Sequence, residues 1–151
     1  MKLAEALIER ADIKKKINQI SHRLKSNAKV QEGTKPVESN EDLMQEYFRV
    51  STLLKEITKK INKTNSITDF GDVKLIDAIV TRDHLALILK GLRELYDAGA
   101  IMPDRYNIRE IKFECNLDMV ELQGKIDSFS KQYKELDVKI QQANWHTMLA
   151  D

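Results

Sequence analysis

The chain has 151 residues, of which 42% are hydrophobic and 32% charged, and it contains only five glycines and two prolines. This composition is typical of long amphipathic helices and argues against a sheet protein or a disordered chain. A net charge of +1 excludes the general attraction to nucleic acid that a strongly basic domain exerts, and the single cysteine, Cys115, excludes an internal disulfide. The N-terminus has no apolar signal-peptide core and no run approaches about 20 apolar residues, so we expect a cytoplasmic protein that does not span a membrane.

Two helices are predicted in the first half of the chain. From Leu3 to about Ala28, apolar residues recur at steps of three and four, a spacing that places them on one side of a helix. Arg10 and Asn27 occupy the two positions of this row that are not apolar. Residues 31–40 contain a glycine, a proline and two capping residues and therefore predict a loop. A second, uninterrupted row predicts a helix from about Glu41 to Asn65.

A turn and a third helix follow. The sequence Asp69-Phe70-Gly71-Asp72 predicts a tight turn within residues 66–74. A helix is predicted from about Leu75 to Ala98, and Arg82 interrupts its apolar row as Arg10 interrupts the first one. The two arginines therefore stand at corresponding places in two helices.

The last part of the chain predicts a short strand and a fourth helix. Between Gly99 and Asn116, apolar residues alternate with charged ones at Ile111, Phe113 and Cys115, and we expect this strand to pair with residues 66–74. The fourth helix is predicted from the capping box of Asp118 to about Trp145.

The helices form an internal repeat of about residues 1–66 and 74–146. An offset of 72 places the third helix over the first, and an offset of 79 places the fourth over the second. Coincident heptads would align the leucines of any two such helices, whereas a match of Arg10 with Arg82 is not required by the apolar pattern. The sequence thus predicts one mainly α domain, residues 1–151, made of two long antiparallel helical hairpins related by duplication, with a small β element in the connections.

Motifs for catalysis or metal binding do not occur. His22, His84 and His146 lack the spacing of a Glu-x-x-His or His-Glu-x-x-His site, and no glycine-rich phosphate loop is present. The lysine runs, such as residues 14–16, have no aromatic residues interleaved with them and are typical of a solvated helix face. We therefore expect no catalytic residue, no metal, no cofactor and no nucleic-acid partner.

Arg10 and Arg82 are the candidate site residues. A guanidinium in an apolar row needs a carboxylate, because an unpaired buried charge would cost several kcal/mol. For Arg82 the available partners are Asp77 and Asp83, and for Arg10 they are residues 5 and 12. Such pairs either fix the register of the helices or line a polar pocket for a small anionic ligand, and we favour the register pair.

Three residues are predicted at a subunit interface. Asn65 and Asn144 correspond in the repeat, and Trp145, the only tryptophan, follows the second of them. At the end of a helix, Trp145 either anchors a subunit contact or packs into the core. Long hairpins leave apolar faces that one chain does not cover completely, so we expect a homo-oligomer.

Short segments over nearly the whole chain carry a family resemblance. They comprise residues 2–7, 9–11, 27–28, 30–33, 61–65, 77–78, 82–83, 104–106, 140–141 and 143–145. In these segments the chain resembles a small bacterial family of uncharacterised helical proteins often labelled septicolysin. The label implies an oxygen-labile cytolysin, but the family carries no established activity or catalytic residue, so the resemblance implies no site.

Taken together, these patterns predict a cytoplasmic, non-enzymatic protein with a structural or protein-interaction role through self-association. A septicolysin-like membrane-active cytolysin is one alternative. A helical-bundle enzyme, or a binder of a small anionic ligand that uses Arg10 and Arg82, is another.

Overall fold

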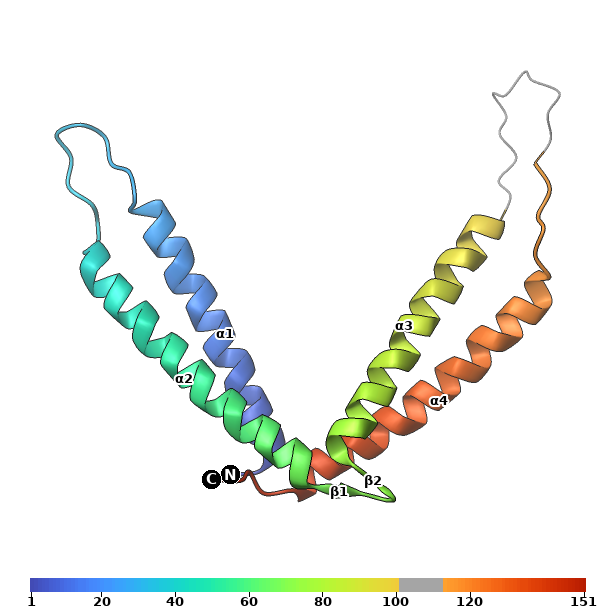
Figure 1. The fold of residues 1–151 in the computed structure, drawn as a ribbon. Helices are drawn as coiled ribbons and strands as arrows, with labels where there is room; N and C mark the ends of the chain where they lie inside the picture. Colours follow the sequence, from blue (N-terminus) through green and yellow to red (C-terminus); the bar gives the residue numbers. More distant parts are fainter. Residues whose placement is uncertain (101–112) are drawn as a thin grey trace. The chain divides into compact units, whose positions relative to one another are not determined.

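The computed structural model describes residues 1–100 and 113–151. Four helices are arranged as two pairs, with a β hairpin between the second and third helices (Figure 1). The helices are α1 (Leu3–Ser26), α2 (Asn40–Ile67), α3 (Leu75–Gly99) and α4 (Met119–His146), and the strands are β1 (Asp69–Phe70) and β2 (Val73–Lys74). The predicted fold class is confirmed, and each predicted helix boundary lies within two residues of the observed one.

Side chains at the helix starts explain where α2 and α4 begin. The hydroxyl of Ser39 accepts a hydrogen bond from the backbone N–H of Asp42 (3.3 Å). The carboxylate of Asp118 accepts one from the N–H of Glu121 (2.9 Å), as the capping box predicts. Both satisfy backbone donors that a helix leaves free in its first turn.

The apolar rows form the contact within each helix pair. In the first pair the buried residues include Ile20, Val50 and Ile61, each 1% exposed. In the second pair, Leu89, Leu122 and Ile126 form a buried cluster between α3 and α4 with partly buried apolar side chains around it: Leu92, Tyr96, Met119, Phe129 and Tyr133. Burial of one such side chain contributes roughly 1.5–3 kcal/mol, so these rows supply most of the stability of each pair.

The β hairpin replaces the strand pairing that the sequence suggested. Residues 66–74 pair with themselves, because β1 and β2 are antiparallel partners across Gly71 and residue 72. Gly71 has φ +63°, and a glycine with positive φ at the first turn position suits a tight two-residue hairpin. Phe113 and Cys115 belong to no strand, so that prediction is wrong for them, and Ile111 lies outside the described residues.

The two ends of the chain repeat the geometry of this hairpin. The N–H of Leu75 donates to the carbonyl of Thr68 across the hairpin (2.9 Å), and the N–H of Leu3 donates to the carbonyl of Thr147 (2.9 Å). Leu3 and Leu75 differ by the predicted offset of 72, and Thr68 and Thr147 differ by the predicted offset of 79. Both leucines are completely buried. These two backbone bonds therefore follow the same offsets as the predicted repeat.

Further bonds hold the C-terminal segment in place. The N–H of Leu149 donates to the carbonyl of Met1 (3.0 Å), and the N–H of Ala150 donates to the hydroxyl of Thr64 (2.9 Å). Thr64 is only 1% exposed, and its hydroxyl in turn donates to the carbonyl of Lys60 (2.7 Å). The buried hydroxyl of Thr64 thus has both a donor and an acceptor.

The chain divides into two compact units. One comprises Met1–Ile76 with Gln141–Asp151, and the other comprises Asp77–Ile140. The first unit holds α1, α2, the hairpin and the pairing of the chain ends, and the second holds most of α3 and α4. The predicted division into a single domain with two repeats stays a prediction.

Candidate functional site

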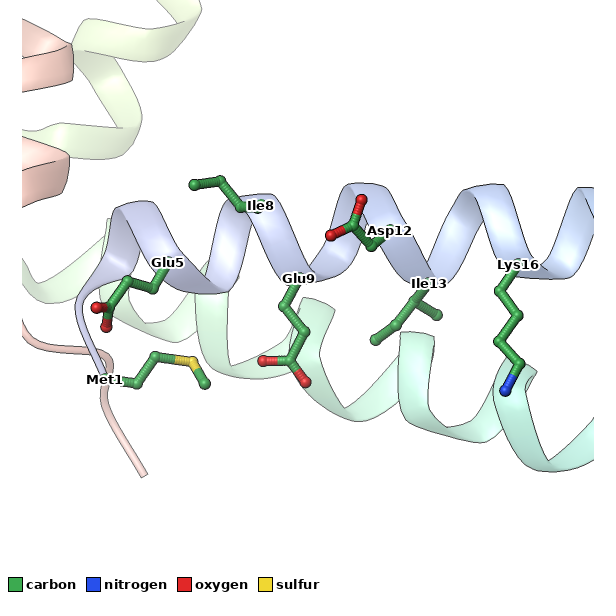
Figure 2. Close-up of a pocket in the computed structure, with 7 residues that line it drawn as sticks. All are labelled: Met1, Glu5, Ile8, Glu9, Asp12, Ile13 and Lys16. Carbon is green, nitrogen blue, oxygen red and sulfur yellow. The ribbon is translucent and has the colours of Figure 1, made fainter.

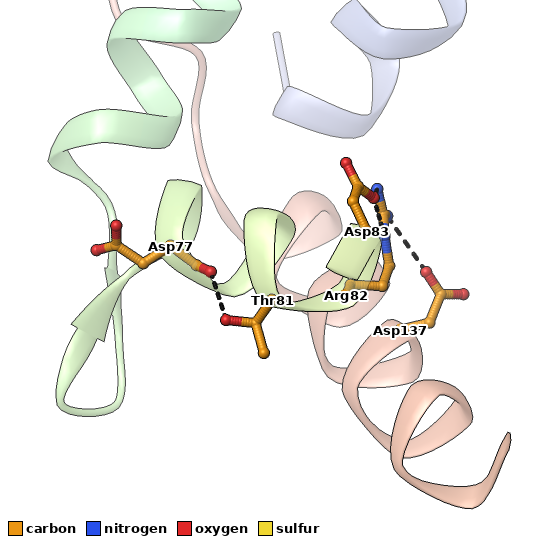
Figure 3. Close-up of polar contacts among 5 residues, drawn as sticks. All are labelled: Asp77, Thr81, Arg82, Asp83 and Asp137. Atoms are coloured by element: carbon orange, nitrogen blue, oxygen red, sulfur yellow. Dashed lines mark hydrogen bonds and ion pairs between the residues drawn. The ribbon is translucent and has the colours of Figure 1, made fainter. Parts of the chain in front are cut away.

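Arg82 lies in an ion-pair network within the second helix pair. Its guanidinium contacts the carboxylate of Asp83 (2.8 Å) and, across from α3 to α4, the carboxylate of Asp137 (3.3 Å) (Figure 3). The side chain is 24% exposed. Burial opposes the charge, but the hydrogen bonds to both carboxylates outweigh it and raise the pKa of Arg82 above its usual value. The group therefore acts as a permanent cation that ties two helices together.

The predicted partners of Arg82 fall in two different places. Asp83 contacts it, as predicted, although this carboxylate is the next residue on the same helix. Asp77 belongs to a different set of contacts: its carbonyl accepts a hydrogen bond from the hydroxyl of Thr81 (2.8 Å), and its carboxylate points away from Arg82 (Figure 3). Asp137, the partner on the opposite helix, was missed, because the sequence does not show which side of α4 faces α3.

Arg10 has no equivalent network. It is half-buried on α1, and its side chain forms no hydrogen bond or ion pair with any described residue. The predicted partners have other contacts, since the carboxylate of Glu5 accepts from the N–H of Lys2 (2.6 Å) and Asp12 pairs with Lys15 (3.5 Å). A long arginine side chain can reach water with its guanidinium while its stem packs on apolar surface, which explains how a partly buried Arg10 is tolerated.

The repeat gives the physical reason for this difference. With the offset of 79, the position of α2 that corresponds to Asp137 of α4 is occupied by Thr58. The first helix pair therefore lacks the carboxylate that Arg82 finds on the neighbouring helix. The structure therefore shows an ion pair between the two helices at Arg82 and none at Arg10 among the described residues, and the role of either arginine in fixing the helix register stays a prediction.

A shallow groove runs along one side of α1 (Figure 2). Its volume is about 600 Å³, and its residues come from Met1 and the first half of α1: Met1, Glu5, Ile8, Glu9, Asp12, Ile13 and Lys16. Its cation, Lys16, is bound to Glu46 of α2 (2.8 Å). Arg49 and Lys16 together lower the pKa of Glu46 to about 2. Three carboxylates and one engaged lysine disfavour an anionic ligand in this groove.

The predicted interface residues differ in exposure. Asn65 is half-buried and Asn144 is buried, at 4% exposure, whereas the next residue, Trp145, is 53% exposed. The side-chain oxygen of Asn144 has no hydrogen-bond partner among the described residues. Trp145 is thus a surface residue rather than a core residue, and its role in a subunit contact stays a prediction.

One further surface feature was not singled out from the sequence. Three large apolar side chains of α3 within the second unit are exposed: Val80 (62%), Leu87 (68%) and Leu95 (42%). At 3.6 residues per turn they lie on one side of α3, together with His84 and Gly91. We call these five residues the α3 stripe. The spacing of Val80 and Leu87 by seven indicates a second apolar row, in addition to the single row from which each helix was predicted.

Two classes of site receive no support from the part of the chain that the structure describes. Within residues 1–100 and 113–151, no three His, Cys, Asp or Glu side chains gather in a way that could hold a metal ion. None of the four helices, as far as they are described, is both long and apolar enough to cross a membrane.

The fold defines the chain as an all-α protein of two antiparallel helix pairs joined by a β hairpin. Residues 10–149 match the model of a family of unknown function (DUF6847), and the chain belongs to this family. It is similar in structure to a functionally unknown conserved protein from Corynebacterium diphtheriae, with a TM-score of 0.90, 36% sequence identity and coverage of 99% of each chain. No curated protein matches the chain in sequence.

Proposed function

We propose that this protein has a non-enzymatic, structural or protein-interaction role and that it acts by self-association. The observation that carries the proposal is the distribution of apolar side chains. Among the described residues, exposed large apolar side chains outnumber the buried ones, and many of them lie on the outer sides of long helices. Single exposed apolar residues are ordinary, but rows of them along helices mark surfaces that a partner covers.

The arrangement of the polar groups agrees with this role. The charged side chains of the Arg82 network are bound to one another, and the lysine of the α1 groove is bound to Glu46. These ion pairs link neighbouring helices, and the charges engaged in them are not directed at a substrate.

Light scattering coupled to size-exclusion chromatography tests the proposal. Self-association predicts a mass above the 17.5 kDa of one chain that rises with protein concentration. A mass of 17.5 kDa that stays constant from micromolar to millimolar protein would overturn it.

A membrane-active role is the second candidate, because the septicolysin label of the family that the sequence resembles implies a cytolysin. Amphipathic helices with exposed apolar residues can lie in the plane of a membrane surface without crossing it. Release of a dye from vesicles of neutral and anionic lipid at micromolar protein would support this candidate. Intact vesicles at every lipid composition would exclude it and leave self-association unaffected.

A further inference from the structure

The α3 stripe is an apolar surface without a partner in its own helix pair. Leu85 and Leu89, which are 8% and 4% exposed, belong to the side of α3 that is buried. At roughly 100° per residue, Val80 and Leu87 lie on nearly the opposite side of the helix. The stripe extends over about 22 Å from Val80 to Leu95, at 1.5 Å per residue.

Gly91 is the one glycine of the stripe and lies one helical turn after Leu87. Glycine is the poorest helix former after proline, so a glycine in the interior of α3 lowers the stability of the helix. A Cβ atom added to Gly91 would meet no atom of the described residues within 4 Å, so packing among those residues does not require the missing side chain. The gap is open to solvent and is next to Leu87, the most exposed apolar side chain of the stripe.

The fold itself does not require this surface. At the corresponding positions of α1, the offset of 72 places Lys15 where α3 has Leu87 and Gln19 where α3 has Gly91. Ile8, which is 54% exposed, corresponds to Val80, but the later positions on this side of α1 are polar where α3 has Leu87 and Gly91.

We infer that the α3 stripe binds the α3 stripe of a second copy of this chain, with the two helices antiparallel; this inference rests on the proposed self-association. A two-fold axis at the level of residue 89 places Leu87 of each copy over Gly91 of the other. Leu87 then fills the gap that Gly91 leaves, twice in each dimer, as expected of a symmetric interface. The same symmetry brings Val80 opposite Ala98.

Avoidance of like charges favours the antiparallel orientation. In this arrangement Glu94, whose carboxylate pairs with Lys90 of its own helix (3.9 Å), lies at the level of His84 in the other copy, once on each side of the axis. A parallel arrangement would instead place Glu94 against Glu94 and Lys90 against Lys90, and opposed like charges are unfavourable. A contact along one helix of this length belongs to the small interfaces, below about 1,200 Å², so the dimer forms reversibly with concentration.

Variants of the stripe test the inference by light scattering and sedimentation. Leu87→Glu and Gly91→Leu should each raise the dimer dissociation constant at least about tenfold, because one introduces a charge and the other fills the gap. Matched controls lie on α4: Val120, which is 85% exposed, changed to Glu, and Gly124, whose Cβ position is equally open, changed to Leu. The controls should leave the constant unchanged, and circular dichroism should show the same helix content in all four variants.

Cross-linking tests the orientation. His84→Cys and Glu94→Cys are prepared separately in a Cys115→Ser background and oxidised alone and mixed. The antiparallel dimer predicts disulfides between the two variants in the mixture and little self-linking of either. Self-linking of each variant alone would overturn the antiparallel arrangement.

The outcomes separate this inference from the proposed function. An oligomer whose dissociation constant is unchanged by Leu87→Glu and Gly91→Leu would overturn the α3 stripe as the interface and leave self-association standing. A protein that is monomeric at all concentrations would overturn both.

Discussion

On α1, the side that corresponds to the α3 stripe carries Ile8, Asp12, Lys15, Gln19 and Arg23. Asp12 pairs with Lys15 (3.5 Å), and Arg23 donates to Glu38, with 3.0 Å from its Nε to the carboxylate. These contacts are those of a solvated helix face. On α3, three of the five corresponding positions hold exposed apolar residues and one holds glycine.

The core positions of the two helix pairs are alike, whereas these outer sides of α1 and α3 differ. Ile61 and Ile140 correspond in the repeat and are each 1% exposed, and Leu43 and Leu122 correspond and are 6% and 7% exposed. The packing of a helical hairpin constrains such positions in the same way in both copies. Outer positions are free of that constraint, so a difference between the copies there points to a difference in partners rather than in folding.

The largest loss of stability is expected at core positions where both helix pairs carry the same residue. Ile61→Ala and Ile140→Ala should each lower the free energy of unfolding by about 2–5 kcal/mol, because each leaves a cavity in a closely packed core. Urea unfolding measures both values. Clearly unequal losses would show that the two cores are not equivalent.

A smaller loss of stability is expected at the two corresponding arginines, because their surroundings differ. Arg82→Ala should cost about 1–2 kcal/mol, because it leaves the 32%-exposed carboxylate of Asp137 without its cation. Arg10→Ala is the matched control, and because Arg10 has no ion pair among the described residues its loss should stay within about 0.5 kcal/mol. Equal losses in urea unfolding would contradict the different roles assigned to the two arginines.

The missing carboxylate of the first pair can be supplied. Thr58→Asp places an acid where α4 has Asp137, and pairing with Arg10 should stabilise the protein by about 0.2–1 kcal/mol. A double-mutant cycle with Arg10→Ala measures the coupling between the two side chains. A coupling energy of zero would mean that the helices of the two pairs are not in the same register.

The smallest effect on stability is expected at Glu46. Its pairing with Lys16 has no counterpart in the second helix pair, because Ile88 occupies the position that corresponds to Lys16. The pKa of Glu46 is lowered to about 2 in the folded protein, so its ion pairs stabilise the fold above the unfolded pKa of about 4.3 and lose this effect as the pH falls toward 2. Glu46→Gln should therefore be slightly less stable than the natural protein at pH 7, and the difference should shrink as the pH falls from about 4.3 through 2. Thermal unfolding over this pH range measures the difference, and Glu121→Gln, which affects a pair within α4 alone, is the control.

Much of the fold could be predicted from the sequence because it depends on local patterns. Apolar spacing located the four helices, and the offsets of 72 and 79 recur in the backbone bonds of Leu3 and Leu75. The predicted strand was wrong because alternation of apolar and charged residues over a few positions does not provide a pairing partner, whereas Gly71 allowed residues 66–74 to pair with themselves.

The site was less predictable because it depends on contacts between elements. The sequence identified Arg82 as a charge that needs a partner, but the identity of Asp137 depends on the rotation of α4 about its own axis. The sequence also treated Arg10 and Arg82 as equivalent, and only the residue opposite each of them, Thr58 in one case and Asp137 in the other, distinguishes them.

The pairing of the chain ends implies that the order of the helices along the chain is interchangeable. The offsets of 72 and 79 place Ala150 and Asp151 at the positions of Gly71 and Asp72, and Met1 at the position of Val73. A peptide bond from Asp151 to Met1, with Ala150→Gly to permit the positive φ of a tight turn, would form a second hairpin like the first. A circular permutant joined in this way and opened between Gly71 and Asp72 should fold to the same helix pairs in the order α3, α4, α1, α2.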